Sequence, residues 1–154
     1  MQVFVTPDSM RAWSHDRRRD GERVAVVPTM GALHEGHASL MRASRERDDI
    51  VVISIFVNPA QFAPHEDFDK YPRTWEADCA IAEEVGVDCI YVPDARDMYP
   101  DGYTTYVTVE ELDKRMCSVS RPHFFRGVAT VVTKLFNAVD ADRAYFGQKD
   151  AQQC

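Results

Sequence analysis

Two histidines, His34 and His37, enclose Glu35 and Gly36 and are the side chains of this sequence best suited to chemistry. The run before them is apolar and reaches Pro28, and a helical pattern starts directly after them. This order predicts a strand, a tight loop and a helix N-terminus, where free backbone N–H groups and the helix dipole attract anions. Two imidazoles placed there can donate hydrogen bonds to phosphate oxygens. We therefore expect a nucleotide triphosphate to bind over the end of a parallel strand.

The histidine pair also admits two plainer interpretations, a solvated helix start and half of a zinc site. A zinc-peptidase helix carries its histidines four residues apart in an H-E-x-x-H pattern. Here the spacing is three, and Gly36 lies between the two histidines. The zinc interpretation is therefore disfavoured, whereas an incidental histidine pair stays an alternative until the structural context is known.

Strands and helices alternate along the sequence. The spacing predicts strands over 3–5, 23–28, 50–57, 88–92 and 143–147, with an edge strand over 103–109. It predicts helices over about 7–21, 36–48, 74–85 and 127–139. Thr6 is the expected N-cap of the first helix and Gly86 the expected C-cap of the third. Such alternation is typical of βαβ units, so the fold class is α/β, a Rossmann-like parallel sheet flanked by helices.

Three polar segments follow predicted strands, at residues 28–37, 58–61 and 146–150. In parallel sheets, ligands bind beyond the carboxyl ends of the strands. The three segments are far apart in the sequence, but all three lie at that edge. We therefore expect them to converge on one site.

Composition limits the class of protein. The chain has 154 residues, which is one domain by size, and 45% of them are apolar. The net charge of −7 argues against nonspecific binding to nucleic acid. No stretch approaches the roughly 20 apolar residues that cross a bilayer, and the N-terminus does not have the pattern of a signal peptide. Four cysteines form no C-x-x-C pair and are expected to be reduced thiols in a cytoplasmic protein, without a membrane partner.

Several segments together resemble the pantoate–β-alanine ligase (pantothenate synthetase) family, in family order and over nearly the whole chain. The matching segments are PTMGALHEGH at 28–37, SIFVNPAQF at 54–62, YPRT at 71–74 with Asp78, MYPDG at 98–102, SRP at 120–122, FRGVATVV at 125–132 and YFGQKD at 145–150. The resemblance implies a fold of the HIGH-type nucleotidyltransferase superfamily. It also implies a homodimer.

The same resemblance implies an adenylate-forming ligase with the substrates ATP, pantoate and β-alanine, and with Mg²⁺. The pantoate carboxylate would attack the α-phosphorus of ATP and release pyrophosphate. The amine of β-alanine would then attack the pantoyl adenylate, giving pantothenate and AMP. A carboxylate is a poor electrophile, and adenylation supplies a good leaving group. The protein then has mainly to position two anions and to offset the charge that grows at phosphorus.

Residue roles follow from the resemblance, position by position. His37 is similar to the residue assigned as general acid, with His34 beside it, and Lys149 would face phosphate and Asp150 the ribose. Asp78 would be linked to magnesium, and Gln61 would meet both pantoate and β-alanine. The first ATP loop would comprise Met30, Gly31, Ala32, Leu33, His34, Glu35, Gly36 and His37, the second Gly147, Gln148, Lys149 and Asp150, and the pantoate site Asn58, Gln61 and Gln153.

The chain departs from the family mainly in length. Family members continue with a C-terminal region whose serine- and arginine-containing loop closes over ATP, so residues 1–154 are expected to be the N-terminal ATP- and pantoate-binding domain alone. Without that region we expect much weaker catalysis and more self-association. Smaller departures are a shifted histidine at His123, Gln148 in place of the usual glutamate, and Ala77 where some members carry a second acid.

Two competing hypotheses come from other classes of function. In the first, the chain is a module that folds, dimerises and holds ATP or pantoate without turnover. In the second, it is a nucleotidyltransferase that adenylates a phosphate instead of a carboxylate. The segment from Asn58 to Phe62 argues against the second hypothesis, because it resembles the pantoate contacts of the ligase family.

Overall fold

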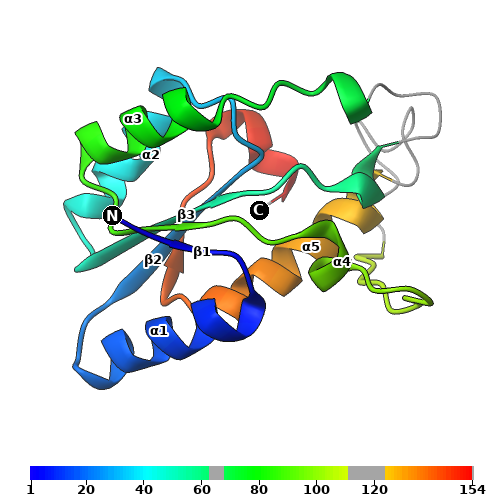
Figure 1. Ribbon diagram of the computed structural model, residues 1–154, viewed down its shortest axis with the longest axis horizontal. Coiled ribbons are helices and arrows are strands. Elements are labelled where there is room, and N and C mark those ends of the chain that lie inside the picture. Colours follow the sequence, from blue (N-terminus) through cyan, green and yellow to red (C-terminus); the bar gives the residue numbers. More distant parts are fainter. Residues whose placement is uncertain (63–67, 111–123, 154) are drawn as a thin grey trace.

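A computed structural model describes residues 1–62, 68–110 and 124–153 of the protein. Its centre is a parallel sheet of five strands in the order β1-β4-β3-β2-β5, with helices on both faces (Figure 1). The strands are β1 (Gln2–Phe4), β2 (Val24–Thr29), β3 (Ile50–Ile55), β4 (Cys89–Tyr91) and β5 (Arg143–Ala144). The predicted α/β class with a parallel, helix-flanked sheet is confirmed.

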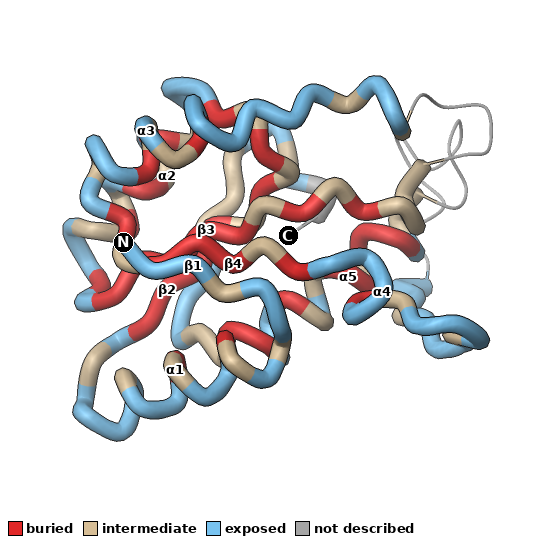
Figure 2. Tube along the Cα trace, viewed as in Figure 1, coloured by how far each residue is buried: buried red, intermediate tan, exposed pale blue. Residues whose placement is uncertain are grey.

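Two central strands, β2 and β3, form the longest pairing of the sheet, from Val24 opposite Ile50 to Thr29 opposite Ile55. Nearly all of their residues are buried, which Figure 2 shows as the continuous buried centre of the molecule. Parallel strands that are covered on both faces are typically rich in valine and isoleucine, and these two strands, VAVVPT and IVVISI, are. Their carboxyl ends therefore form a firm base for the loops that follow them.

The helices cover the sheet in two pairs. On one face, α1 (Pro7–Arg19) lies beside α5 (Phe124–Val139), and on the other α2 (Glu35–Arg45) lies beside α3 (Trp75–Val85). Successive strand residues alternate between the two layers, with Val26 packed in the first and Val27 in the second. The short helices are η1 (Pro59–Gln61), η2 (Phe68–Lys70), α4 (Ala95–Met98) and η5 (Gln148–Gln153).

Local signals set the helix ends as predicted. The Thr6 side chain accepts a hydrogen bond from the Ser9 N–H at 3.3 Å, with Pro7 at the first helical position. Gly86 ends α3 with φ of 82°, a left-handed conformation that glycine adopts without steric cost.

Three expectations are corrected. Residues 103–109 form no strand, because they pack against α5 instead of the sheet, and the Val107 N–H donates to the Thr130 hydroxyl at 3.0 Å. The last strand stops at Ala144 rather than at residue 147, because the chain turns there into the site. The helical spacing of Trp75 with Cys79 and Ala82 also predicts that Trp75 faces the core, but this residue is 44% exposed.

Among the residues that the structure describes, no helix is long and apolar enough to cross a membrane. The SRP segment at 120–122 and His123 lie outside the described residues.

Candidate active site

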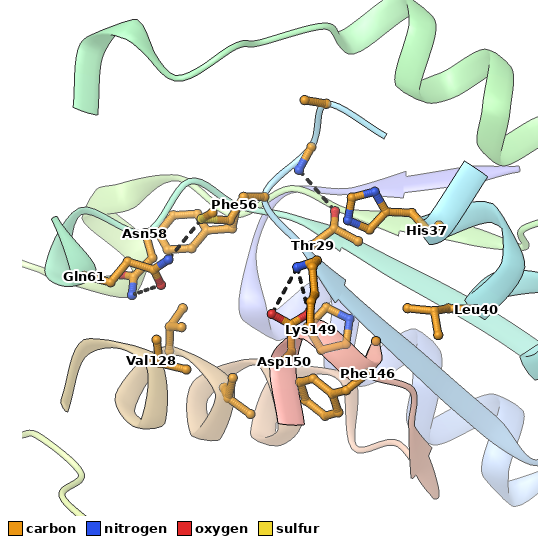
Figure 3. A pocket seen from close by; sticks show the side chains of 18 of the residues that line it. Thr29, His37, Leu40, Phe56, Asn58, Gln61, Val128, Phe146, Lys149 and Asp150 are labelled. Atoms are coloured by element: carbon orange, nitrogen blue, oxygen red, sulfur yellow. Dashed lines mark hydrogen bonds and ion pairs between the residues drawn. The ribbon is translucent and has the colours of Figure 1, made fainter. Parts of the chain in front are cut away.

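The carboxyl ends of β2 and β3, the loop after β5 and one side of α5 enclose a cavity of about 930 Å³ (Figure 3). This volume lies within the range of small-molecule sites. The predicted site residues that line it are Met30, Gly31, Ala32, His34, Gly36, His37, Asn58, Gln61, Gly147, Gln148, Lys149 and Asp150. The three polar segments that were expected to converge do converge.

Three of the remaining four predicted site residues do not line this cavity. Leu33 is buried in the core between the sheet and the helices α2 and α3. Glu35 is exposed and pairs with Arg42 on its own helix. Asp78 is buried behind the histidine loop. The side chain of Gln153 lies outside the described residues, so the contact of Gln153 with pantoate stays a prediction.

The histidine loop places two imidazoles side by side at the start of α2. His34 is the N-cap, and its Nδ1 accepts the Gly36 N–H at 3.0 Å, which leaves Nε2 as the donor of the neutral ring. The rings of His34 and His37 lie 4.1 Å apart between centroids. A Cβ at Gly36 would lie 2.9 Å from the His34 ring, so only glycine permits this packing. The arrangement places two imidazoles and a helix N-terminus at the wall of one cavity, as an anion site requires.

Asp78 holds the backbone of the same loop from behind. It is 2% exposed, and its carboxylate accepts from the Ala32 N–H at 3.1 Å, from the Leu33 N–H at 2.7 Å and from the Thr74 hydroxyl at 3.1 Å. Ala32 has a positive φ of 50°, which is uncommon for a residue with a side chain and marks a loop held by its surroundings.

These contacts bear on the expected magnesium link. The described residues contain no group of three or more His, Cys, Asp or Glu side chains that could hold a metal ion. Two hydrogen bonds already occupy Oδ1 of Asp78, and the side chain is buried. The geometry therefore favours a backbone-holding role for Asp78, and coordination of magnesium by this residue stays a prediction.

A polar pair lies at the opposite side of the cavity from His37 (Figure 3). Asn58 follows β3 and starts η1, and its Nδ2 donates to the Gln61 Oε1 at 3.1 Å. Gln61 in turn places its Nε2 3.1 Å from the Sδ of Met30, in the first loop. The expected pantoate residues are therefore in contact with the expected ATP loop.

The second loop supplies a cation. Lys149 Nζ lies 2.8 and 3.0 Å from the two carboxylate oxygens of Asp150. The loop is anchored at its start by Tyr145, whose hydroxyl donates to the buried Asp48 at 2.6 Å.

Burial lowers the pKa of His37, and the neighbouring His34 and Lys149 lower it further. The ligand-free cavity therefore favours a neutral imidazole at His37, ready to gain a proton beside an anion.

An apolar wall completes the cavity, and sequence reasoning about the site missed it. Four residues of α5 line it at helical spacing: Val128, Val131, Val132 and Leu135. Phe56, Phe62, Phe124, Tyr145 and Phe146 add aromatic surface. The i, i+3, i+4, i+7 pattern was visible in the sequence, but it is equally typical of a helix packed on a core. One cavity thus offers donors for anionic groups and an apolar surface for a branched aliphatic chain.

Comparisons with known proteins agree with this arrangement. A family model described as Pantoate-beta-alanine ligase matches residues 2–154. The chain is 58% identical to a pantothenate synthetase of Pelotomaculum thermopropionicum and 56% identical to one of Geobacter sulfurreducens, in each case over 99% of this chain and 54% of the relative. The chain therefore spans about half the length of the curated relatives it matches.

Solved structures give the same result for the fold. Pantothenate synthetase from Thermus thermophilus superimposes with a TM-score of 0.90 at 45% identity, over 99% of this chain and 54% of that chain. A pantoate-beta-alanine ligase from Francisella tularensis, described as complexed with beta-gamma ATP and beta-alanine, gives a TM-score of 0.92 at 34% identity, over 99% and 59%. By its sequence over nearly its whole length and by its fold, this chain belongs to the pantoate-beta-alanine ligase family.

Proposed function

We propose that this chain carries the ATP- and pantoate-binding site of a ligase that joins pantoate to β-alanine with the conversion of ATP to AMP and pyrophosphate. One observation carries the proposal: the two candidate ATP loops, the Asn58–Gln61 pair and an apolar wall line a single cavity. Family membership and the ligand description of the Francisella structure add support.

In the first step, an oxygen of the pantoate carboxylate bonds to the α-phosphorus of ATP, and the bond from that phosphorus to the pyrophosphate oxygen breaks. Negative charge shifts onto the departing pyrophosphate. His34 and His37 at the helix N-terminus, together with Lys149, are the groups that would offset this charge. The branched carbon chain of pantoate would lie on the wall formed by α5, while Gln61 would face its polar end.

In the second step, the amine of β-alanine bonds to the activated carbonyl carbon, the bond to AMP breaks, and the amine loses a proton to solvent. The task of the site is to hold the amine in line with that carbon and to exclude water. Gln61 fits a positioning contact here, because it lies between the pantoate side and the ATP loop.

Magnesium belongs to the proposal as part of the substrate. Mg²⁺ keeps several waters and binds mainly through phosphate oxygens and one or two carboxylates. We propose that it enters as the MgATP complex, so that the cavity needs no metal cluster of its own.

A homodimer in the cytoplasm is also part of the proposal. Val3 in β1 and Val5 directly after it are exposed at one edge of the sheet, and an apolar sheet edge favours association. Light scattering of the purified chain at several concentrations tests the dimer directly.

The decisive experiment measures AMP and pyrophosphate release by the chain, together with calorimetric titrations of ATP and pantoate. We expect AMP only when pantoate and β-alanine are both present, and pyrophosphate when β-alanine is omitted. His37→Ala should abolish turnover, whereas His15→Ala, an exposed histidine of α1 outside the cavity, should not. Binding of both ligands without turnover would favour the binding module instead, and AMP transfer to a phosphate acceptor would favour the nucleotidyltransferase.

A further inference from the structure

Asn58 was expected to contact pantoate, but its side-chain amide is already saturated. The residue is 1% exposed. Its Nδ2 donates to the Gln61 Oε1 and to the Gly127 carbonyl, both at 3.1 Å. Its Oδ1 accepts from the Ala60 N–H at 3.2 Å and from the Tyr99 hydroxyl at 2.7 Å. A primary amide has two N–H donors and two acceptor lone pairs, so all four hydrogen bonds of Asn58 are made inside the protein.

Two backbone groups fix which way this amide points. The Ala60 N–H can only donate and the Gly127 carbonyl can only accept, so Oδ1 of Asn58 must face the former and Nδ2 the latter. Because Nδ2 also donates to Gln61, that residue must present its Oε1 to Asn58. The nitrogen of the Gln61 amide then faces the other way, toward the Sδ of Met30 in the cavity wall.

The Tyr99 hydroxyl makes the shortest of the four hydrogen bonds to Asn58. It acts as the donor, because Oδ1 of Asn58 can only accept. Burial raises the pKa of Tyr99 far above its usual value of 10.0, so the hydroxyl keeps its proton and donates it. Its ring lies 5.2 Å from the Tyr103 ring, edge to face, and 5.3 Å from Lys134 Nζ. Tyr99 follows α4 and is not among the described residues that line the cavity, so its hydroxyl acts on a ligand there through Asn58.

We propose that Tyr99 is a positioning residue for the pantoate side of the site: its hydroxyl clamps Asn58, and Asn58 holds the Gln61 amide with its N–H donors toward the cavity. An amide held in this way favours a ligand that brings an acceptor, such as a carboxylate or a hydroxyl oxygen. The part of this inference that concerns pantoate rests on the proposed function. The part that concerns the ordering of Gln61 by Tyr99 is independent of the proposed function.

The binding test uses Tyr99→Phe, which removes one hydroxyl and keeps the ring. Tyr103→Phe is the matched control, because it removes a hydroxyl from the neighbouring ring without touching Asn58. In calorimetric titrations, Tyr99→Phe should raise the Kd for pantoate about three- to tenfold, as expected for one neutral hydrogen bond. The Kd for ATP should stay within about twofold, and Tyr103→Phe should change neither value.

A double-mutant cycle separates positioning from a general loss of structure. Adding Tyr99→Phe to Gln61→Ala should weaken pantoate binding no further, because the group through which Tyr99 acts is already gone. The proposal would be overturned if Tyr99→Phe weakened pantoate binding equally in the unmodified chain and in Gln61→Ala, or if Tyr103→Phe weakened it as much as Tyr99→Phe.

A second readout needs no ligand. The side-chain NH₂ signals of Gln61, identified by their disappearance in Gln61→Ala, should shift or broaden in Tyr99→Phe and stay in place in Tyr103→Phe. Unchanged Gln61 signals in Tyr99→Phe would overturn the proposal even if pantoate binds. If the unmodified chain does not bind pantoate, the proposed function fails, while these signals still decide whether Tyr99 orders Gln61.

Discussion

The imidazole rings of His34 and His37 lie 4.1 Å apart between centroids, with their planes inclined by 38°. Two rings at this separation disfavour a second positive charge, and His34 is one cause of the lowered pKa of His37. The negative charge of an incoming phosphate opposes this effect, because it stabilises a proton on His37.

We predict that ATP binding draws a proton onto His37. The pKa of His37 lies below its usual value of 6.5 in the ligand-free protein and rises when an anion binds. Affinity for ATP should therefore increase about three- to tenfold as the pH falls from about 7.5 to about 6. Calorimetry in buffers of different ionisation enthalpy measures the proton uptake.

His37→Gln is the matched control, because glutamine donates a hydrogen bond and does not titrate. The ATP affinity of this variant should depend on pH only through the protonation of the ATP phosphates. Stability should change with pH in the opposite direction: the unfolded chain holds the proton more tightly than the folded chain, so the ligand-free protein should lose stability as the pH falls below about 6.5. Proton uptake that persists in His37→Gln would contradict the assignment.

We predict that Asp78 acts by holding the backbone of residues 32 and 33 rather than by binding metal. Asp78→Asn places an N–H₂ group among backbone N–H donors, which should cost about 2–4 kcal/mol in the free energy of unfolding and weaken ATP binding. Thr74→Val removes only one of the three hydrogen bonds and should cost about 1 kcal/mol. Urea unfolding and ATP titrations at several Mg²⁺ concentrations measure both effects. A variant of normal stability that needs much more Mg²⁺ would instead identify Asp78 as a metal ligand.

The sequence was sufficient where the physical cause is local. Apolar runs rich in valine and isoleucine predicted β2 and β3, and Thr6 and Gly86 marked helix ends through hydrogen bonds within a few residues. The meeting of the histidine loop with the Gly147–Asp150 loop followed from one rule, that parallel strands end at the same edge.

Roles set by partners far along the chain could not be predicted. Asn58 was expected to be a ligand residue, and its saturation depends on Tyr99, 41 positions away, and Gly127, 69 positions away. Residues 103–109 alternate like a strand, but Thr130 of α5 takes the N–H of Val107 that a strand would have used. Alternation of apolar and polar residues indicates that one side of the segment faces an apolar surface. It does not tell whether a helix or a sheet provides that surface.

We predict that Gly127 is required for the close approach of α5 to η1. A Cβ at this position would lie 2.4 Å from the Ala60 carbonyl oxygen. Gly127→Ala should therefore push η1 away, cost about 1–3 kcal/mol in stability and raise the Kd for pantoate about tenfold by disturbing Asn58. Thr133→Ala, at an exposed position of the same helix, is the control and should leave pantoate binding unchanged. Normal pantoate binding by Gly127→Ala would show that the approach does not matter for the site.

We predict that Lys149 recognises the phosphates of ATP and not its nucleoside. In the ligand-free protein its ammonium group pairs with Asp150 in an exposed setting, and a triphosphate offers a stronger partner. Lys149→Met keeps the length of the side chain and removes the charge. It should weaken ATP binding about tenfold or more at low salt, with a smaller loss at about 0.5 M salt, and leave adenosine binding unchanged. Lys70→Met, a lysine outside the cavity, is the control for net charge. If adenosine loses as much affinity as ATP, the lysine shapes the loop instead of binding phosphate.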